Sequence, residues 1–142
     1  MLNGQVIVVT GAAGLIGSAI SRAIVAQGGR AVLVDINESR LTTLCADLDA
    51  HHSLALCADA SAAAGVDSII AAALQRFDRL DAAVHSAYPR SAGWGTPFEA
   101  LTAEYLNEDL SLQLGGAILF SQGMLRQFKR QGHGNLIHIA SI

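Results

Sequence analysis

Residues 6–17 read Val6-Ile7-Val8-Val9-Thr10-Gly11-Ala12-Ala13-Gly14-Leu15-Ile16-Gly17. The four consecutive β-branched residues are typical of a short buried parallel strand, and the spaced glycines after them predict a tight turn that opens a helix. One glycine permits the sharp turn, one lets backbone N–H groups approach a ligand, and one lets the helix pack close to the strand. Because the positive end of the helix would face that ligand, the stretch indicates a phosphate-binding turn.

Asp35 is the acidic residue that complements this turn. It ends a second apolar strand and follows the glycines at close to the ~20-residue spacing of a carboxylate that holds a ribose hydroxyl. Asp35 could instead cap the following helix or pair with Arg40, and we favour ribose binding because of its place at a strand end. A carboxylate there repels a 2′-phosphate, and no arginine stands at Ile36 or Asn37. We therefore predict NAD rather than NADP as the cofactor.

The composition limits the class of protein. The 142 residues are 51% hydrophobic with a formal net charge of −3, and the mean hydropathy is +0.39, so we expect one domain, residues 1–142, with its own core. The longest apolar runs, such as residues 69–74, fall well short of the roughly 18 residues of a membrane-spanning helix. The acidic balance offers no basic face for nucleic acid. With no targeting segment before the first strand, we expect a cytoplasmic protein.

Cysteine and histidine spacing gives no sign of a metal site. Cys45 and Cys57 lack CxxC spacing and predict ordinary thiols. Four histidines show no ligand spacing with acids or cysteines, so no metal is expected. They are His51, His52, His133 and His138.

Strands and helices alternate along the chain. After the first strand, the apolar patterns predict strands at residues 30–35, 54–57, 82–85 and 135–142, and helices at 15–27, 39–48, 66–77 and 102–131. Gly115-Gly116 interrupts the long helix and predicts a bend or close backbone packing, since each glycine costs a helix about 1 kcal/mol relative to alanine. The alternation predicts a doubly wound parallel sheet with helices on both faces. A last strand without a covering helix would expose apolar surface, so we expect the fold to be interrupted there.

Several motifs in order carry a resemblance to a known family. They are TGAAGLIG (10–17), Asp35, Asp59, VHSAYP (84–89) and NLIHIASI (135–142). With these motifs the chain resembles the N-terminal part of a short-chain dehydrogenase/reductase. The resemblance implies a Rossmann-type sheet, incomplete, of about five strands in the order 3-2-1-4-5.

The resemblance also assigns the cofactor-binding residues. Gly11, Gly14 and Gly17 match the family's glycine motif, and Leu15 and Ile16 lie in the same turn, with Ile16 at the usual aliphatic position. Further along the chain, the matching positions are Asp59 and Ala60 at the adenine ring, and His85, Ser86 and Ala87 with Tyr88 in place of the NNAG motif.

Two of these assignments have ordinary structural alternatives. Asp59 could cap the third helix, and His85 could simply close a strand end on backbone. Tyr88 and Trp94 are expected to line or cover the substrate side, or to pack within their loop.

The resemblance implies catalytic positions as well. Ser141 matches the serine that hydrogen-bonds the reacting oxygen. The family's asparagine on the long helix falls near Ser111 or Gln113, and Gln113 could supply an amide there.

Two branches of the family compete in the sequence. The GxxGxxG spacing and the VHSA stretch are similar to the extended branch of nucleotide-sugar epimerases and dehydratases. Arg79-Leu80-Asp81, GGAILFSQGMLRQF and QGHGNLIHIAS are similar to the smaller dehydrogenase branch, cover more of the chain and are favoured. Within that branch, AYPR and LGGAILFSQ are similar to oxidoreductases of flagellin-modification and nonulosonic-acid pathways.

The family's tyrosine and lysine pair does not occur in these 142 residues. Lys129 is the one lysine, with Leu125 four positions before it, and neither Tyr88 nor Tyr105 has a lysine four residues later. In the family this pair follows the serine, so we expect the chain to hold the cofactor half of the protein.

The sequence therefore predicts an NAD-dependent oxidoreductase acting on a small polar alcohol or carbonyl substrate, such as a sugar derivative. For a full-length protein the resemblance also implies homo-oligomer contacts through the long helix Thr102 to Gln131. The alternatives are an extended-type epimerase or dehydratase and a catalytically silent dinucleotide-binding module.

Overall fold

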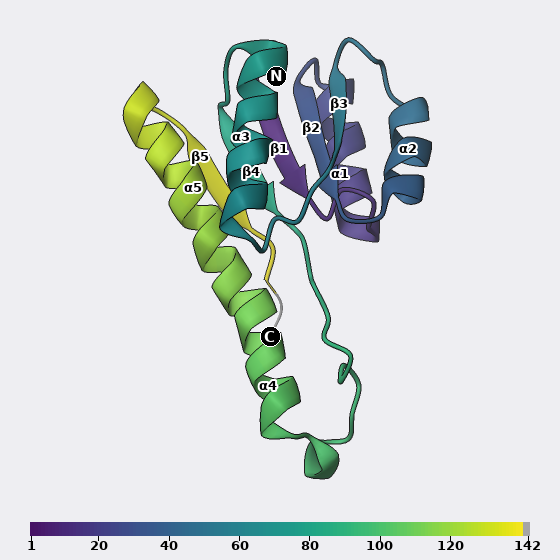
Figure 1. The fold of residues 1–142 in the computed structure, drawn as a ribbon. Coiled ribbons are helices and arrows are strands. Elements are labelled where there is room, and N and C mark those ends of the chain that lie inside the picture. Colours follow the sequence, from purple (N-terminus) through teal and green to yellow (C-terminus); the bar gives the residue numbers. More distant parts are fainter. Residues whose placement is uncertain (141–142) are drawn as a thin grey trace.

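The computed structural model describes residues 1–140, which form one parallel sheet with helices on both faces (Figure 1). The strand order is β3-β2-β1-β4-β5, as predicted, and every neighbouring pair is parallel. The strands are β1 (Val6–Thr10), β2 (Arg30–Asp35), β3 (Ser53–Cys57), β4 (Ala82–His85) and β5 (Asn135–His138). The predicted α/β Rossmann-type sheet is confirmed.

The helices alternate with these strands. They are α1 (Leu15–Ala26), α2 (Glu38–Ala46), α3 (Ala63–Phe77), α4 (Ala103–Leu110) and α5 (Gly116–Gln131), with a short 3₁₀ turn, η1 (Phe98–Ala100), and a π-helical segment, η2 (Ser111–Gly115). The predicted long helix is thus continuous from α4 through η2 to α5.

Alternation along β1 divides the core between the two faces of the sheet. Val6 and Val8 point into a cluster with α3 and α5 that includes Phe120 and Met124. Ile7 and Val9 point the other way, into a cluster with α1 and α2. Because side chains on a strand alternate with a period of two, an apolar run buried on both faces is what a central parallel strand requires.

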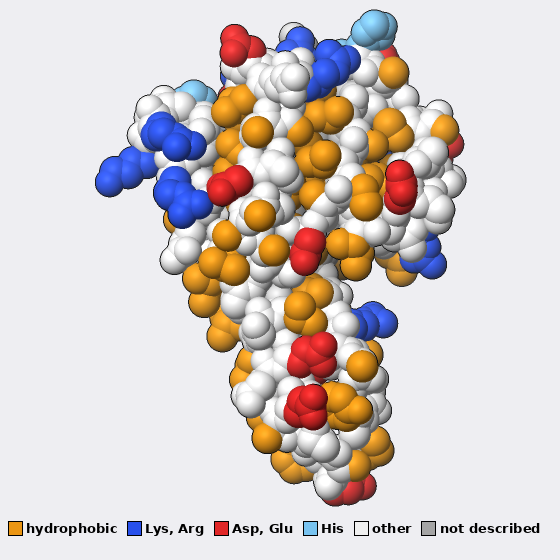
Figure 2. Space-filling view, viewed as in Figure 1, with side chains coloured by type: hydrophobic (Ala, Val, Ile, Leu, Met, Phe, Trp, Pro, Cys, Tyr) orange, Lys and Arg blue, Asp and Glu red, His pale blue; other side chains and the backbone are white. Residues whose placement is uncertain are grey.

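One glycine of the pair in the long helix, Gly116, serves close packing. A Cβ on Gly116 would lie 2.7 Å from the Cβ of Ser61, so only glycine lets α5 approach the loop before α3 this closely. At Gly115 the helix widens to a π turn instead of ending. The lower part of this helix extends away from the sheet (Figure 1), and exposed apolar side chains lie over this lower part of the molecule (Figure 2). They include Leu106, Leu110, Leu114 and Ile118.

Several predicted boundaries were wrong, and the third helix begins at Ala63 rather than at residue 66. β5 ends at His138 rather than residue 142, because its partner β4 ends at His85, which pairs with His138. The second helix begins at Glu38 and ends at Ala46, since the Asn37 side chain caps it by accepting a hydrogen bond from the Arg40 N–H at 3.1 Å. Residues 141–142 of the predicted fifth strand lie outside the described residues.

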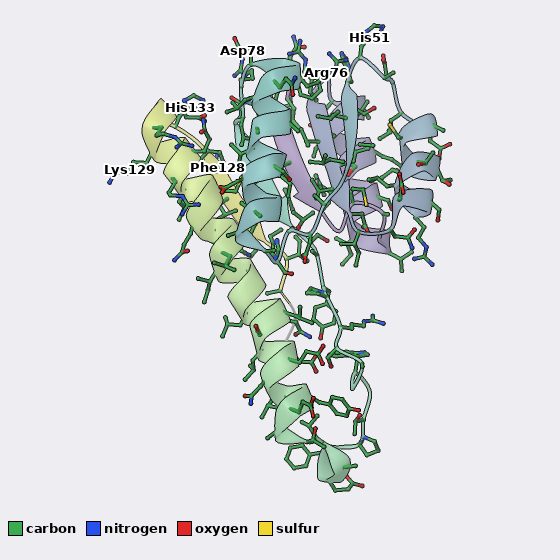
Figure 3. The ribbon with its side chains drawn as sticks, viewed as in Figure 1. His51, Arg76, Asp78, Phe128, Lys129 and His133 are labelled. Atoms are coloured by element: carbon green, nitrogen blue, oxygen red, sulfur yellow. The ribbon has the colours of Figure 1, made fainter. Side chains whose placement is uncertain are left out.

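The amino and carboxyl ends of the strands carry different groups of residues. His51, Arg76, Asp78 and His133 gather at the amino ends of the strands, the upper edge in Figure 3. The glycine turn lies at the opposite edge, where the carboxyl ends of the strands meet. Ligands of open parallel sheets bind at that carboxyl edge. No helix within residues 1–140 has the length and hydropathy to cross a bilayer.

Candidate functional site

The turn between β1 and α1 has the geometry that its glycines predict. Gly11 has a φ of +64°, and the Gly14 N–H donates to its carbonyl oxygen at 3.0 Å. A Cβ on Gly17 would lie only 2.1 Å from that oxygen, so α1 begins directly against the turn. No side chain within the described residues caps α1, whose N-cap residue is Gly14. The first backbone N–H groups of α1 are therefore free to meet an anion.

Asp35 reaches back from the end of β2 to this turn. Its Oδ2 accepts a hydrogen bond from the Ala13 N–H at 3.0 Å, and its Oδ1 accepts one from the Asn37 N–H at 2.9 Å. The carboxylate is thus held in one orientation beside the glycine turn. Neither alternative for Asp35 occurs among the described residues, because Asn37 caps α2 and no ion pair joins Asp35 to Arg40.

Asp59 closes a small loop after β3. Its Oδ1 accepts hydrogen bonds from both the N–H and the hydroxyl of Ser61, at 2.8 and 2.6 Å. The alternative that Asp59 caps the third helix was wrong, because α3 starts at Ala63 with Ala62 in the cap position. Ala60 beside it is buried in the core.

A row of polar side chains crosses the carboxyl ends of three strands. In the register Thr10 pairs with His85, and His85 pairs with His138. The Thr10 Oγ1 accepts hydrogen bonds from the Ser86 and Ala87 N–H groups, both at 3.2 Å, and lies 2.9 Å from His85 Nδ1. Because those two bonds occupy the lone pairs of Oγ1, its proton must go to Nδ1. His85 is therefore a neutral imidazole that carries its proton on Nε2.

Its surroundings keep His85 neutral. The ring is buried and stacks on Phe120 at 4.8 Å between centroids, with His138 edge-on at 5.3 Å. Burial, and secondarily the nearby charge of His138, lower the pKa of His85 from 6.5 to about 4. His138 itself lies 3.0 Å from the hydroxyl of Ser121, which donates to a helical carbonyl. The alternative for His85, a strand-end residue closing on backbone, does not describe these contacts, since its partner is the side chain of Thr10.

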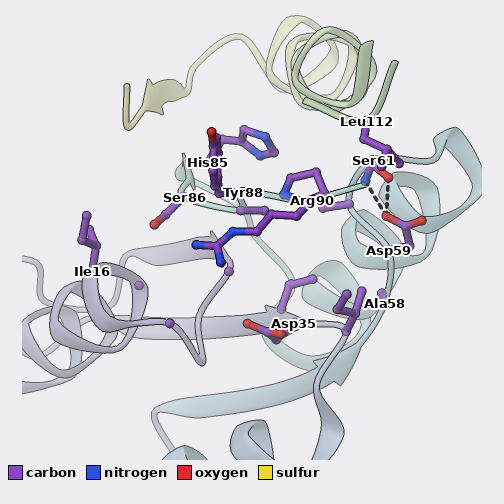
Figure 4. A pocket seen from close by; sticks show the side chains of 18 of the residues that line it. Ile16, Asp35, Ala58, Asp59, Ser61, His85, Ser86, Tyr88, Arg90 and Leu112 are labelled. Carbon is purple, nitrogen blue, oxygen red and sulfur yellow. Dashed lines mark hydrogen bonds between the residues drawn. The ribbon is translucent and has the colours of Figure 1, made fainter. Parts of the chain in front are cut away.

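The glycine turn, Asp35, Asp59 and His85 line one cleft of about 590 Å³ at the carboxyl edge of the sheet (Figure 4). The lining includes every cofactor-binding residue expected from the sequence. They are Gly11, Gly14, Leu15, Ile16, Gly17, Asp35, Asp59, Ala60, His85, Ser86 and Ala87. Leu15 and Ile16 are largely exposed despite being apolar, which is understandable for residues at the rim of a binding cleft.

Gln113, one of the two expected catalytic positions, does not line this cleft. Gln113 is in the π turn η2, where its Nε2 is buried and has no hydrogen-bond partner among the described residues. Its neighbour Leu112 reaches the cleft instead. Ser141 lies outside the described residues. Within residues 1–140, no group of three or more His, Cys, Asp or Glu side chains could hold a metal ion.

Sequence reasoning missed two side chains in or behind the cleft, Arg90 in its lining and Thr10 buried behind it. Thr10 fixes the β4 loop and the tautomer of His85, and its signal was a hydroxyl at the end of an otherwise apolar strand. Arg90 lines the cleft from the loop after β4, and from the sequence it was included only within the AYPR segment, without a role of its own. Tyr88 also lines the cleft, as expected, while Trp94 packs on Tyr88 at a centroid distance of 5.1 Å.

The arrangement fits a dinucleotide. The glycine turn, whose space a Cβ would fill, suits the phosphates. The carboxylate fixed at the end of β2 suits a ribose, and the second carboxylate, after β3, suits an adenine ring. The cleft continues past His85 to the loop after β4, where the second half of such a molecule would lie.

Comparison with known proteins supports this description. The family model described as short chain dehydrogenase matches residues 5–142. The chain is 36% identical over 146 residues to post-translational flagellin modification protein A of Campylobacter coli, covering 100% of this chain and 57% of that protein. It is 33% identical over 144 residues to D-threitol dehydrogenase of Mycolicibacterium smegmatis, covering 99% and 54%.

A solved structure gives the same fold. A short chain dehydrogenase from Bacillus anthracis superimposes with a TM-score of 0.89 at 19% identity, over 99% of this chain and 57% of that one. The chain thus spans about half the length of the curated relatives it matches.

Proposed function

This chain belongs to the short-chain dehydrogenase family, and we propose that its cleft binds NAD as the cofactor half of an oxidoreductase that acts on an alcohol or carbonyl substrate. The observation that carries the proposal is the fixed Asp35 carboxylate beside the glycine turn, within one cleft. A carboxylate there accepts hydrogen bonds from the ribose hydroxyl groups and repels a 2′-phosphate, which favours NAD over NADP.

Each part of the cleft has a role in holding the cofactor. The free N–H groups of the glycine turn and of α1 bind the phosphates, and Asp35 binds the adenine ribose. Asp59 and Ala60 contact the adenine ring. The nicotinamide ribose lies against His85, Ser86 and Ala87. The neutral His85 offers an Nε2–H donor there.

The bound nicotinamide supplies the carbon that gives or accepts hydride. The chain's own part is to hold that ring in one orientation and to keep nearby groups in fixed protonation states. Ser141 would polarise the reacting oxygen, and the buried, unpartnered amide of Gln113 would donate where the family's asparagine does.

The substrate is proposed at the level of a class. D-threitol dehydrogenase takes its name from a sugar alcohol, and this supports a small polar alcohol or a sugar derivative for the complete protein. The match of the short chain dehydrogenase model over residues 5–142 supports the smaller branch over the extended epimerases and dehydratases.

Ligand-dependent stability tests the proposal. If NAD binds the folded chain, a concentration of 100 times Kd raises the free energy of unfolding by about 2.7 kcal/mol. Chemical unfolding with and without NAD measures this increase, and NADP at the same concentration is the matched ligand control. An unfolding midpoint that NAD leaves unchanged up to millimolar concentrations would contradict the proposal, and an equal effect of NADP would contradict the role of Asp35.

A further inference from the structure

The loop between β4 and η1 is held in place against α4. The N–H of the buried Ser91 donates to Asp109 Oδ1 at 3.0 Å, and the Gly93 N–H donates to Ser91 Oγ at 3.2 Å. Gly93 lies so close to the Tyr105 ring that a Cβ added to Gly93 would be 2.2 Å from Cγ of Tyr105. The backbone next to Arg90 is therefore fixed by contacts to α4 on the side away from the cleft.

The Arg90 side chain is also held in one orientation. Its guanidinium carbon lies 5.8 Å from the centroid of the Tyr88 ring and 5.5 Å from that of Trp94, and the two rings meet edge to face. A guanidinium on two aromatic faces loses little further entropy when it binds a ligand. In Figure 4 the side chain extends from the β4 loop across the cleft, its guanidinium directed to the side where Ile16 and Asp35 lie.

Arg90 has no acidic partner in the cleft. Among residues 1–140 it forms no ion pair, although Asp35 and Asp59 line the same cleft. The hydrogen bonds described for those carboxylates go to backbone N–H groups and to Ser61 instead. The guanidinium donors are thus available to an anionic ligand.

The charge of the cleft indicates which anion this is. The glycine turn, residues 11–17, contains no lysine or arginine, so backbone dipoles alone would face the two negative charges of a dinucleotide pyrophosphate. Arg40 also lines the cleft, but it comes from α2 and lies in addition on a smaller cavity with Arg22. Arg90 enters from the β4 side of the turn, where the lining, within the described residues, offers no other lysine or arginine side chain.

We propose that Arg90, held by Tyr88 and Trp94, binds the pyrophosphate of the dinucleotide across from the glycine turn. This inference rests on the proposed NAD binding and adds a residue to it. A planar guanidinium can donate two hydrogen bonds to one phosphate, so the contact also fixes the position of the cofactor.

Calorimetric titration of the Arg90→Gln variant tests the proposal with three probes: NADH, ADP and adenosine. Arg126→Gln is the matched control, because it also removes one arginine charge but from an exposed site on α5 that pairs with Asp67. We expect Arg90→Gln to weaken NADH and ADP by about tenfold each, the size of one charge-assisted contact. Adenosine, which lacks phosphate, should bind both variants and the wild type equally.

The possible outcomes separate the inference from the function beneath it. Wild-type affinity of Arg90→Gln for NADH and ADP would overturn the inference and leave NAD binding intact. An equal loss for adenosine would also overturn it, because it would mean that the variant alters the shape of the cleft. A wild-type protein that binds no NADH would overturn both.

Discussion

Replacing Gly17 with alanine would place a methyl group 2.1 Å from the carbonyl oxygen of Gly11 and 2.9 Å from the Cα of Ala12. Both neighbours are backbone atoms of the glycine turn, so no side chain can rotate away to make room. Helix α1 would have to withdraw from the turn by at least about 1.3 Å to restore an ordinary van der Waals contact of 3.4 Å. That displacement carries the first N–H groups of α1 away from the phosphate position.

The size of the effect follows from two opposing terms. Inserting a methyl group into a rigid, filled site costs about 1–3 kcal/mol of folding free energy, and this site lies at the upper end because the contact is with backbone. Because alanine is a better helix former than glycine, it offsets at most about 1 kcal/mol of that loss in folding free energy. We expect a net loss of about 2 kcal/mol in the free energy of unfolding, with NADH affinity at least tenfold weaker.

Gly115→Ala is the matched control for this substitution. Gly115 is also helical, with a φ of −59°, but a Cβ there would have no neighbour closer than 3.8 Å. Urea unfolding and NADH titration of both variants provide the comparison, and Gly115→Ala should be as stable as the wild type or more so. If Gly17→Ala matched Gly115→Ala in stability and wild type in affinity, the close approach of α1 to the turn would not be what forms the phosphate site.

Three further substitutions test the rest of the site. Asp35→Asn should weaken NADH binding by about tenfold and bring the NADH and NADPH affinities together, since the charge that repels a 2′-phosphate is gone; an unchanged preference in parallel titrations would refute the role of Asp35. Thr10→Val should cost about 2–3 kcal/mol in urea unfolding, because it leaves the Ser86 and Ala87 N–H groups without their acceptor; a loss below about 0.5 kcal/mol would mean that those bonds are replaced by water. The pKa of His85 is lowered to about 4 in the folded protein, so the unfolded chain binds more protons between that value and about 6.5, and stability falls by up to about 3 kcal/mol as the pH drops through this window. His85→Asn should remove that part of the pH dependence and exposed His51→Asn should not; identical profiles for the two variants would count against a buried neutral His85.

The parts of the fold that the sequence predicts well depend on local patterns. Residues 6–9 are buried on both faces of the sheet, so an unbroken β-branched run could only be a central strand, and Gly11 needs the positive φ that a tight turn imposes. The end of β5 depends instead on where β4 ends, which is a pairing between distant segments. A periodicity argument cannot detect that limit, and it extended the strand beyond His138, where β5 ends.

The residues of the site likewise divide into those that could be predicted from the sequence and those that could not. It could be predicted that residues at the ends of β1, β2 and β4 line one cleft, because parallel strands bring their carboxyl ends to one edge. Arg90 was missed because its importance comes from stacking on Tyr88 and Trp94 and from the absence of an acidic partner among the described residues, both of which are three-dimensional facts. Thr10 was missed for a related reason, since its hydroxyl acts on backbone groups about 75 residues later.

Parallel titrations of the wild-type protein with NADH and NADPH test the central claim most directly. Trp94 is the chain's one tryptophan and packs on Tyr88 and Arg90 of the cleft lining, so energy transfer from it to a bound reduced nicotinamide reports occupancy. The account predicts saturable transfer with NADH at an affinity at least about tenfold above that for NADPH. No saturable binding of NADH, or equal affinities for the two dinucleotides, would contradict it.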